Sequence, residues 1–301
     1  MAGARPVNEA VAMSPRFVTS GGIELAVFEQ GNRAGPVVVL VHGYPYTHEV
    51  WDDICAGLAA DHRLVRYDVR GAGRSGRPVN VAGYRLSQLA DDLFAVIDAA
   101  GGQAHVVAHD WGSIQAWHAV TDPRAAGRIA SFTSISGPCL DHVGYWFRQR
   151  LRRPTPRHVT QLGRQLARSW YIGVFQLPLL APAAWRWGLA RRWPAVLQRV
   201  EGVAPRPGFP ADTLCGDAIR GISLYRANMG RRLPGPQPRH TGVPVQLITL
   251  TRDHYVSPAL SDGLECWAPN LTRRTLAATH WSALTVQASA VAGMIREFAA
   301  P

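Results

Sequence analysis

The stretch that most constrains the fold is Val106-Val107-Ala108-His109-Asp110-Trp111-Gly112-Ser113. An apolar, β-branched run that stops at a reactive side chain among small residues, with a helical pattern behind it, is typical of a strand-to-helix elbow that exposes a nucleophile. Here the exposed residue is Asp110, whose carboxylate suits attack on saturated carbon and would leave an alkyl ester for water to cleave. Taken alone, the stretch is equally compatible with an aspartate that caps the next helix.

Strand and helix patterns alternate on both sides of this elbow. Before residue 137 they predict a hairpin across 17–28, strands at 36–41, 64–67, 105–108 and 129–136, and helices at 50–60, 86–100 and 114–120. After residue 240 they predict strands at 245–250 and 271–276 and a helix at 283–298. This alternation predicts an α/β fold with a parallel, doubly wound sheet.

The stretch between these two halves has a different character. Between Pro138 and Arg239 lie five of the ten tryptophans and seventeen arginines against four acidic residues, with no strand pattern. We interpret it as a helical insertion over the sheet. The chain then divides into a first part of the α/β core at 15–137, the insertion at 138–240 and a second part of the core at 241–299, after a polar leader at residues 1–14.

Charge and cysteine content narrow the function classes. The net charge of +11 is carried by arginine alone, and the arginines form no short run with interleaved aromatic residues, so we expect no nucleic-acid partner. A basic field can still attract anionic lipid or an acidic substrate. The four cysteines lie far apart, which predicts free thiols and no metal site, and no apolar run is long enough to span a bilayer. We expect a cytoplasmic protein and leave peripheral membrane association and a homodimer open.

Three chemically reactive residues each follow the predicted end of a strand. Asp110 follows the strand at 105–108, Asp253 follows that at 245–250, and His280 follows that at 271–276. The carboxyl ends of parallel strands meet at one edge of the sheet, where open α/β folds bind ligands. Any one of the three is more simply explained as a capping or surface residue. Together, in the order nucleophile, acid and histidine, they favour a catalytic triad.

These residues resemble the α/β-hydrolase-fold epoxide hydrolases over nearly the whole chain. The resemblance rests on His42-Gly43-Tyr44-Pro45, on 68–75, on His109–Ser113, on His280-Trp281, and on 171–178 and 224–229 in the insertion. The sequence at 108–113 and 130–138 is similar to the hydrolase half of actinobacterial proteins in which a short-chain dehydrogenase domain follows the epoxide hydrolase domain. No dehydrogenase half is present in these 301 residues, so we expect either that it was removed or that the chain is a stand-alone relative.

The resemblance implies an α/β-hydrolase fold with a mostly parallel eight-stranded sheet flanked by helices, in which the insertion forms a helical cap. It implies that Asp110 attacks an epoxide carbon while Tyr171 and Tyr225 donate hydrogen bonds to the departing oxygen. His280, oriented by Asp253, would then activate water to cleave the ester and release a vicinal diol. No cofactor or metal is needed for this chemistry.

Two further groups of residues come from the same resemblance. The backbone N–H groups of Tyr44 and Trp111 would form the oxyanion hole. The side chains expected to contact a lipophilic substrate are those of Trp111, Trp170, Phe175 and Trp281.

The sequence departs from the family's pattern around the triad acid. Leu250 stands where a glycine usually precedes this acid, and Ser257 adds a residue before Pro258. Asp141, just after the strand that ends at Ser136, is therefore kept as the alternative to Asp253.

Two other functions stay open at this stage. A haloalkane-type hydrolytic dehalogenase uses the same aspartyl ester, but typically has a halide-binding asparagine where Tyr44 stands and has no use for paired tyrosines. A non-catalytic binding module that kept the fold is a third reading, against which the intact nucleophile, base and tyrosines argue.

Overall fold

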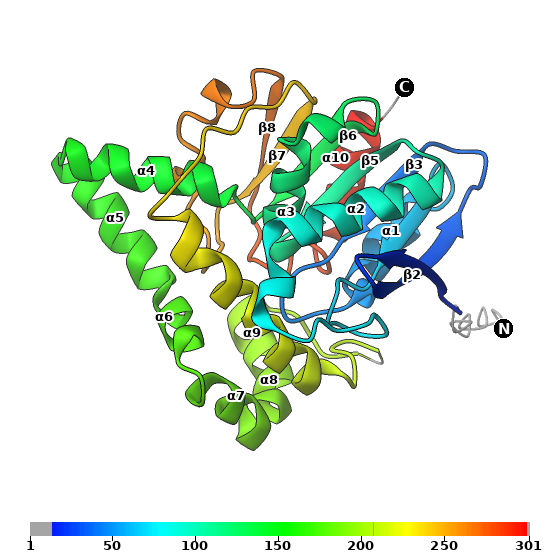
Figure 1. Ribbon diagram of the computed structural model, residues 1–301, viewed down its shortest axis with the longest axis horizontal. Coiled ribbons are helices and arrows are strands. Elements are labelled where there is room, and N and C mark those ends of the chain that lie inside the picture. Colours follow the sequence, from blue (N-terminus) through cyan, green and yellow to red (C-terminus); the bar gives the residue numbers. More distant parts are fainter. Residues whose placement is uncertain (1–13, 207, 300–301) are drawn as a thin grey trace, which may run out of the picture.

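A mixed eight-stranded sheet forms the centre of the molecule, which is described by a computed structural model over residues 14–206 and 208–299. The strand order is β1-β2-β4-β3-β5-β6-β7-β8 (Figure 1). The strands are β1 (Arg16–Ser20), β2 (Ile23–Gly31), β3 (Val37–Val41), β4 (Arg63–Tyr67), β5 (Ala104–His109), β6 (Ile129–Ile135), β7 (Val245–Leu250) and β8 (Leu271–Leu276). β2 pairs antiparallel with β1 and with β4, and every other neighbouring pair is parallel. The predicted leader lies outside the described residues, apart from residue 14.

Helices cover both faces of this sheet (Figure 1). The helices of the core are α1 (Asp52–Leu58), α2 (Leu86–Ala100), α3 (Trp111–Val120) and α10 (Ala288–Phe298). Residues of α2 and α3 pack into one hydrophobic cluster, whereas residues of α1 and α10 pack into another. β3 lies between them, because Val39 and Val41 belong to the first cluster and Val38 and Leu40 to the second. A continuous apolar strand is thus buried on both faces, as its composition requires.

The helical insertion lies between β6 and β7. Its helices are α4 (Leu140–Arg152), α5 (Pro156–Arg168), α6 (Trp170–Gln176), α7 (Leu180–Ala184), α8 (Ala190–Val196) and α9 (Leu214–Arg232). The side chain of Asn228 on α9 accepts a hydrogen bond from the Leu86 N–H at 3.0 Å and donates to the Tyr84 carbonyl at 2.9 Å. Asp217 accepts from the Gly73 N–H at 3.0 Å, so α9 is fastened to the core at two places. The domain boundaries at 138 and 240 stay a prediction.

The sequence pattern located the elements of the core, with one clear difference. The final helix begins at Ala288 rather than at residue 283, because the chain before it is held in turns. The Ser282 hydroxyl accepts from the Thr279 N–H at 2.8 Å, and the Ser282 carbonyl accepts from the Gln287 N–H at 2.8 Å. Residues 279–287 therefore belong to the loop that carries His280.

All four cysteines, Cys55, Cys139, Cys215 and Cys266, are free thiols. Within residues 14–206 and 208–299, no helix combines the length and the apolar content that a membrane crossing needs.

We expect replacement of Asp92 by asparagine to destabilise the fold by about 3–5 kcal/mol, because it leaves the buried Arg70 guanidinium without a compensating charge. Arg70 donates from Nε to Asp92 at 2.6 Å, and both side chains are at most 2% exposed. The neighbouring Asp91 provides a matched control, since it pairs with Arg124 at the surface and its loss should cost about 1 kcal/mol or less. Urea unfolding of Asp92→Asn and Asp91→Asn measures both values, and equal losses would contradict this expectation.

Candidate active site

The elbow at Asp110 joins the end of β5 to the start of α3. Asp110 has backbone angles of φ 53° and ψ −127°, a strained combination that costs about 1–3 kcal/mol. Two glycines make room for it. A Cβ on Gly112 would lie 2.1 Å from the carbonyl oxygen of Val41, and a Cβ on Gly137 would lie 2.1 Å from that of Asp110. The elbow is thereby held against the loops that follow β3 and β6.

His280 lies between two carboxylates. Its Nδ1 is 3.0 Å from Oδ2 of Asp253, and its Nε2 is 3.4 Å from Oδ2 of Asp110. Asp253 is fixed in turn by two backbone N–H groups, which donate to its Oδ1 at 2.7 and 3.0 Å, and by the hydroxyl of Ser136, which donates to its Oδ2 at 2.6 Å. One imidazole therefore bridges a candidate nucleophile and a candidate acid, as a triad base must.

Electrostatic interactions set the protonation states of His280 and Asp253. Burial disfavours the charged imidazole of His280, but the negative charges of Asp253 and Asp110 outweigh burial and raise its pKa to about 10. Burial likewise disfavours the charged form of Asp253, but the imidazolium and its hydrogen bonds outweigh this and lower the pKa of that carboxyl to about 2. At neutral pH, a protonated His280 imidazole therefore lies beside an ionised Asp253.

The loop after β3 supplies a hydrogen bond to Asp110. The Tyr44 N–H donates to Oδ1 of Asp110 at 2.7 Å. Gly43 permits this approach, since a Cβ there would lie 2.3 Å from the same oxygen. Trp111 opens α3, so its N–H is among the helix amides without a partner inside the helix. One carboxylate oxygen of Asp110 thus already accepts a backbone hydrogen bond.

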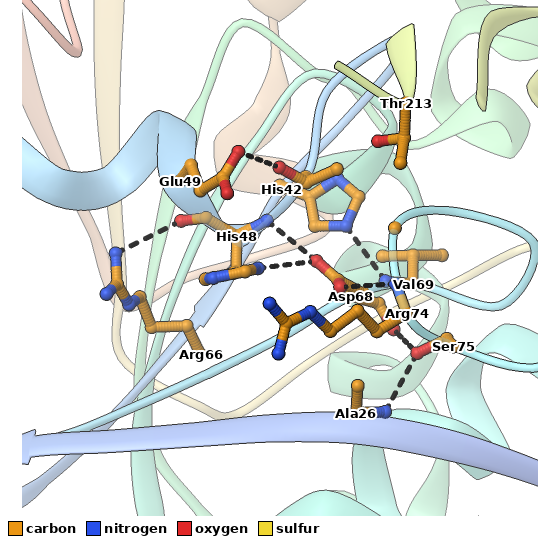
Figure 2. Close-up of polar contacts among 12 residues, drawn as sticks. Ala26, His42, His48, Glu49, Arg66, Asp68, Val69, Arg74, Ser75 and Thr213 are labelled. Atoms are coloured by element: carbon orange, nitrogen blue, oxygen red, sulfur yellow. Dashed lines mark hydrogen bonds and ion pairs between the residues drawn. The ribbon is translucent and has the colours of Figure 1, made fainter. Parts of the chain in front are cut away.

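A buried polar network holds this loop in place (Figure 2). The Val69 N–H donates to Nε2 of His42 at 2.8 Å, and the His48 N–H donates to Asp68 at 2.9 Å. Nδ1 of His48 lies 2.7 Å from the same carboxylate. Burial favours the neutral form of Asp68, but the contacts with His48 outweigh it and lower the pKa of this carboxyl. The loop that carries Tyr44 is therefore tied at both ends to the segment after β4.

A cavity of about 290 Å³ is lined by Asp110, Trp111, Tyr171, Tyr225 and Tyr255, together with mostly apolar side chains from α4, α5 and α9. The rings of Tyr171 and Tyr225 are 6.0 Å apart. Burial and the Asp110 carboxylate raise the pKa of both phenols, which therefore stay protonated and able to donate. Helices α6 and α9, far apart in the chain, thus bring two phenols to one carboxylate.

Only one of the four side chains predicted to contact the substrate lines this cavity. Trp111 lines the cavity. Phe175 does not line it but packs against Tyr225, with ring centroids 4.8 Å apart. Trp281 is buried beside the His280 ring, 4.9 Å between centroids, and does not line the cavity. Trp170 is 69% exposed and also lies outside it. Neighbouring residues on a helix point about 100° apart, so α6 cannot turn both Trp170 and Tyr171 inward.

Asp141, the alternative acid, lies elsewhere. It accepts hydrogen bonds from the Gln237 N–H at 2.9 Å and from Nε of Arg239 at 2.6 Å. It therefore anchors the return from the insertion to the core, and Asp253 is the acid that reaches His280. The departures at Leu250 and Ser257 did not move the acid to another loop.

Three side chains at this site were missed in the sequence. Tyr255 lines the cavity with its ring 5.7 Å from that of Tyr171 and 5.0 Å from that of His280. Ser136 fixes Asp253, and the buried, neutral His109 donates from Nε2 to the His280 carbonyl at 3.0 Å. Their positions gave a signal, because all three follow or end strands at this edge of the sheet: His109 ends β5, Ser136 follows β6, and Tyr255 lies in the loop after β7.

Comparison with known proteins agrees with this architecture. Residues 36–285 match the model of the alpha/beta hydrolase fold family. A probable oxidoreductase of Mycobacterium tuberculosis, EphD, is 38% identical over 295 residues, which cover 95% of this chain and 49% of that protein. Epoxide hydrolase A of the same organism is 30% identical over 247 residues, which cover 81% of this chain and 69% of the relative. The chain thus spans about half the length of the first relative and two thirds of the second.

Solved structures give the same picture. An epoxide hydrolase from Bacillus megaterium superposes with a TM-score of 0.77 at 21% identity, over 94% of this chain and 99% of the other. An epoxide hydrolase mutant from Vigna radiata gives 0.71 at 25% identity, over 95% and 98%. The chain therefore belongs to the α/β-hydrolase fold family, and within it to the proteins of the epoxide hydrolase type.

The raised pKa of His280 predicts how stability depends on pH. Because the folded pKa of about 10 exceeds the unfolded value of ~6.5, the pairing should contribute fully below pH ~6.5 and be lost as pH rises through about 10. Asp253, with a pKa of about 2, stays ionised throughout and adds no slope in this window. Urea unfolding across the alkaline range should show a free energy that falls for the wild type and less so for His280→Gln. Identical slopes would contradict the charge assignment.

Proposed function

We propose that the chain hydrolyses lipophilic epoxides to vicinal diols, with Asp110 as the nucleophile and residues 138–240 as a cap over the reaction cavity. One observation carries the proposal: a single cavity is lined by a carboxylate and two protonated phenols, with an imidazole 3.4 Å from the carboxylate. Relatives and structural neighbours named epoxide hydrolase support it. The mostly apolar lining of the cavity supports a lipophilic substrate.

In the first half-reaction, Oδ2 of Asp110 attacks an epoxide carbon. A C–O bond forms on the enzyme as a C–O bond of the ring breaks. A phenol of Tyr171 or Tyr225 gives its proton to the departing oxygen, because an alkoxide is a poor leaving group, and is left as a phenolate. Oδ1, which accepts the Tyr44 N–H, becomes the ester carbonyl oxygen.

Ester formation also prepares the base. It removes the Asp110 charge, which is one of the causes that raise the pKa of His280. That pKa therefore falls, and the imidazolium can give its proton to the phenolate, which restores the phenol and leaves the imidazole neutral. The neutral imidazole then takes a proton from water, whose oxygen attacks the ester carbon, and the oxyanion forms on the oxygen that the Tyr44 N–H already contacts. As the intermediate collapses, the proton of the new carboxyl group passes to the departing oxygen, which releases the diol and restores the carboxylate beside the imidazolium, so the cycle needs no net proton.

A hydrolytic dehalogenase would form the same ester and release a halide instead of opening a ring. It would need no proton donor for the leaving group, whereas this cavity brings two protonated phenols to the nucleophile. The ring-opening reaction accounts for these phenols and the dehalogenase reaction does not.

We expect Asp110→Ala to abolish turnover and His280→Gln to stop after the first half-reaction. His280→Gln keeps the nucleophile but lacks the base, so it should accumulate an alkylated enzyme. Mass spectrometry after incubation with styrene oxide should find the added mass on the peptide that contains Asp110. Asp110→Ala is the control and should gain none. An unmodified His280→Gln protein, or a label on another residue, would contradict the two-step scheme.

Loss of either cap phenol should slow the ring-opening step. Tyr171→Phe and Tyr225→Phe should each lower the single-turnover rate of alkylation by roughly 10²-fold, and the double variant by more, because an acid contributes about 10²–10⁴. Tyr145→Phe is a matched control, since Tyr145 packs on Trp267 and does not line the cavity. Unchanged alkylation rates in both cap variants would remove the phenols from the mechanism.

A further inference from the structure

The charge of this protein is concentrated in one segment of the helical insertion. Residues 142–200 contain eleven arginines and no aspartate or glutamate. The other twenty-one arginines of the chain are matched by twenty-one acidic residues, so this segment accounts for the whole net charge of +11. A field with such an origin attracts anionic partners to the insertion and not to the core.

These arginines are largely without acidic partners. Among the described residues, Arg150 alone of the eleven lies within ion-pair distance of a carboxylate, that of Asp262 at 2.6 Å. Nine of the others are exposed, namely Arg148, Arg152, Arg153, Arg157, Arg164, Arg186, Arg191, Arg192 and Arg199. Their guanidinium groups are therefore available for an external anion.

The same segment exposes apolar side chains. Among the described residues, nine of the thirteen exposed large hydrophobic side chains fall within it: Leu151, Val159, Leu166, Trp170, Leu177, Leu179, Leu180, Trp187 and Val200. Leu179 and Trp187 are 79% and 81% exposed. Helices α5, α6 and α7 follow one another along an outer edge of the molecule, away from the sheet (Figure 1). We call the exposed surface of residues 156–196, from α5 to α8, the outer edge.

The cavity reaches the same surface. Leu166, at the end of α5, lines the cavity and is 59% exposed. Ser169, Ile172 and Gly173, at the junction of α5 and α6, also line it. The cavity therefore extends to the outer edge, beside its exposed apolar side chains.

We propose that the outer edge docks on an anionic phospholipid bilayer, with its arginines on lipid phosphates and side chains such as Leu179 and Trp187 at the acyl boundary. Basic residues combined with exposed Trp and Leu are the chemistry of interfacial membrane binding. A second copy of this chain fits less well, because pairing two such surfaces would bring unpaired arginines together. The inference rests on the proposed function in one respect: a lipophilic epoxide dissolved in the bilayer would enter the cavity from there.

Vesicle flotation with the intact chain tests the docking. We expect at least about tenfold more bound protein with phosphatidylcholine–phosphatidylglycerol vesicles than with phosphatidylcholine alone, and a loss of binding at high salt. Arg191→Gln/Arg192→Gln should weaken binding several-fold. Arg33→Gln/Arg77→Gln removes the same charge from exposed positions on the core and should not. Equal binding to both vesicles, or equal effects of the two double variants, would overturn the proposal.

A second pair of variants tests the apolar contribution. Leu179→Ser/Trp187→Ser should reduce binding, whereas Val79→Ser/Val286→Ser, at exposed positions on the core, should not. Turnover of a water-soluble epoxide should be the same in both pairs, which shows that each is folded. Two results would overturn the bilayer as the occupant. One is a dimer, found by sedimentation without lipid, that Leu179→Ser/Trp187→Ser abolishes. The other is salt-sensitive binding to an acidic protein in place of vesicles. Vesicle binding by a protein inactive on all epoxides would contradict the proposed function alone.

Discussion

The strained backbone of Asp110 is the constraint on which the rest of the site depends. A positive φ at a non-glycine residue persists only where its surroundings leave no alternative. Here the surroundings are glycines 43, 112 and 137, each of which lets a neighbouring segment come closer than a Cβ would permit. The sheet supplies these segments, because the strands that precede them are parallel neighbours whose carboxyl ends meet at one edge. The fold thus positions one carboxylate from several sides.

Charge balance explains why the parts of the site belong together. An imidazole whose pKa is raised to about 10 is a poor base, because it is already protonated at neutral pH. In the proposed mechanism, alkylation of Asp110 removes one of the charges that raise the pKa of His280. The step that forms the ester therefore also allows the imidazole to act as the base that cleaves it. The hydrogen bonds to Asp253 help to keep this carboxylate ionised, so Asp110 is the only one of the two carboxylates whose charge changes in the proposed mechanism.

The sequence predicted the core far better than the insertion, for a physical reason. Asp110, Asp253 and His280 could be brought together because strand ends are visible in the pattern and parallel strands share an edge. The side chains of α6 in the insertion could not be oriented, because this seven-residue helix is apolar on nearly every side and has no polar face to mark the solvent side. Tyr171 and Trp170 are adjacent, yet one lines the cavity and the other is exposed. Tyr255 was missed because it lies in an irregular loop, where no periodicity indicates direction.

The arginines that give the chain its net charge, at residues 142–200, are not among the groups that set the pKa of His280. Exposed charges act on the triad only weakly, since solvent and salt screen them within about 10 Å. The causes that shift the pKa of His280 are burial and its two carboxylate partners, and no arginine is among them. Outside residues 142–200 the chain has equal numbers of arginines and acidic residues, and therefore no net charge of its own. Residues 142–200 can therefore carry eleven arginines, the groups proposed to contact an anionic surface, without changing the pKa of His280.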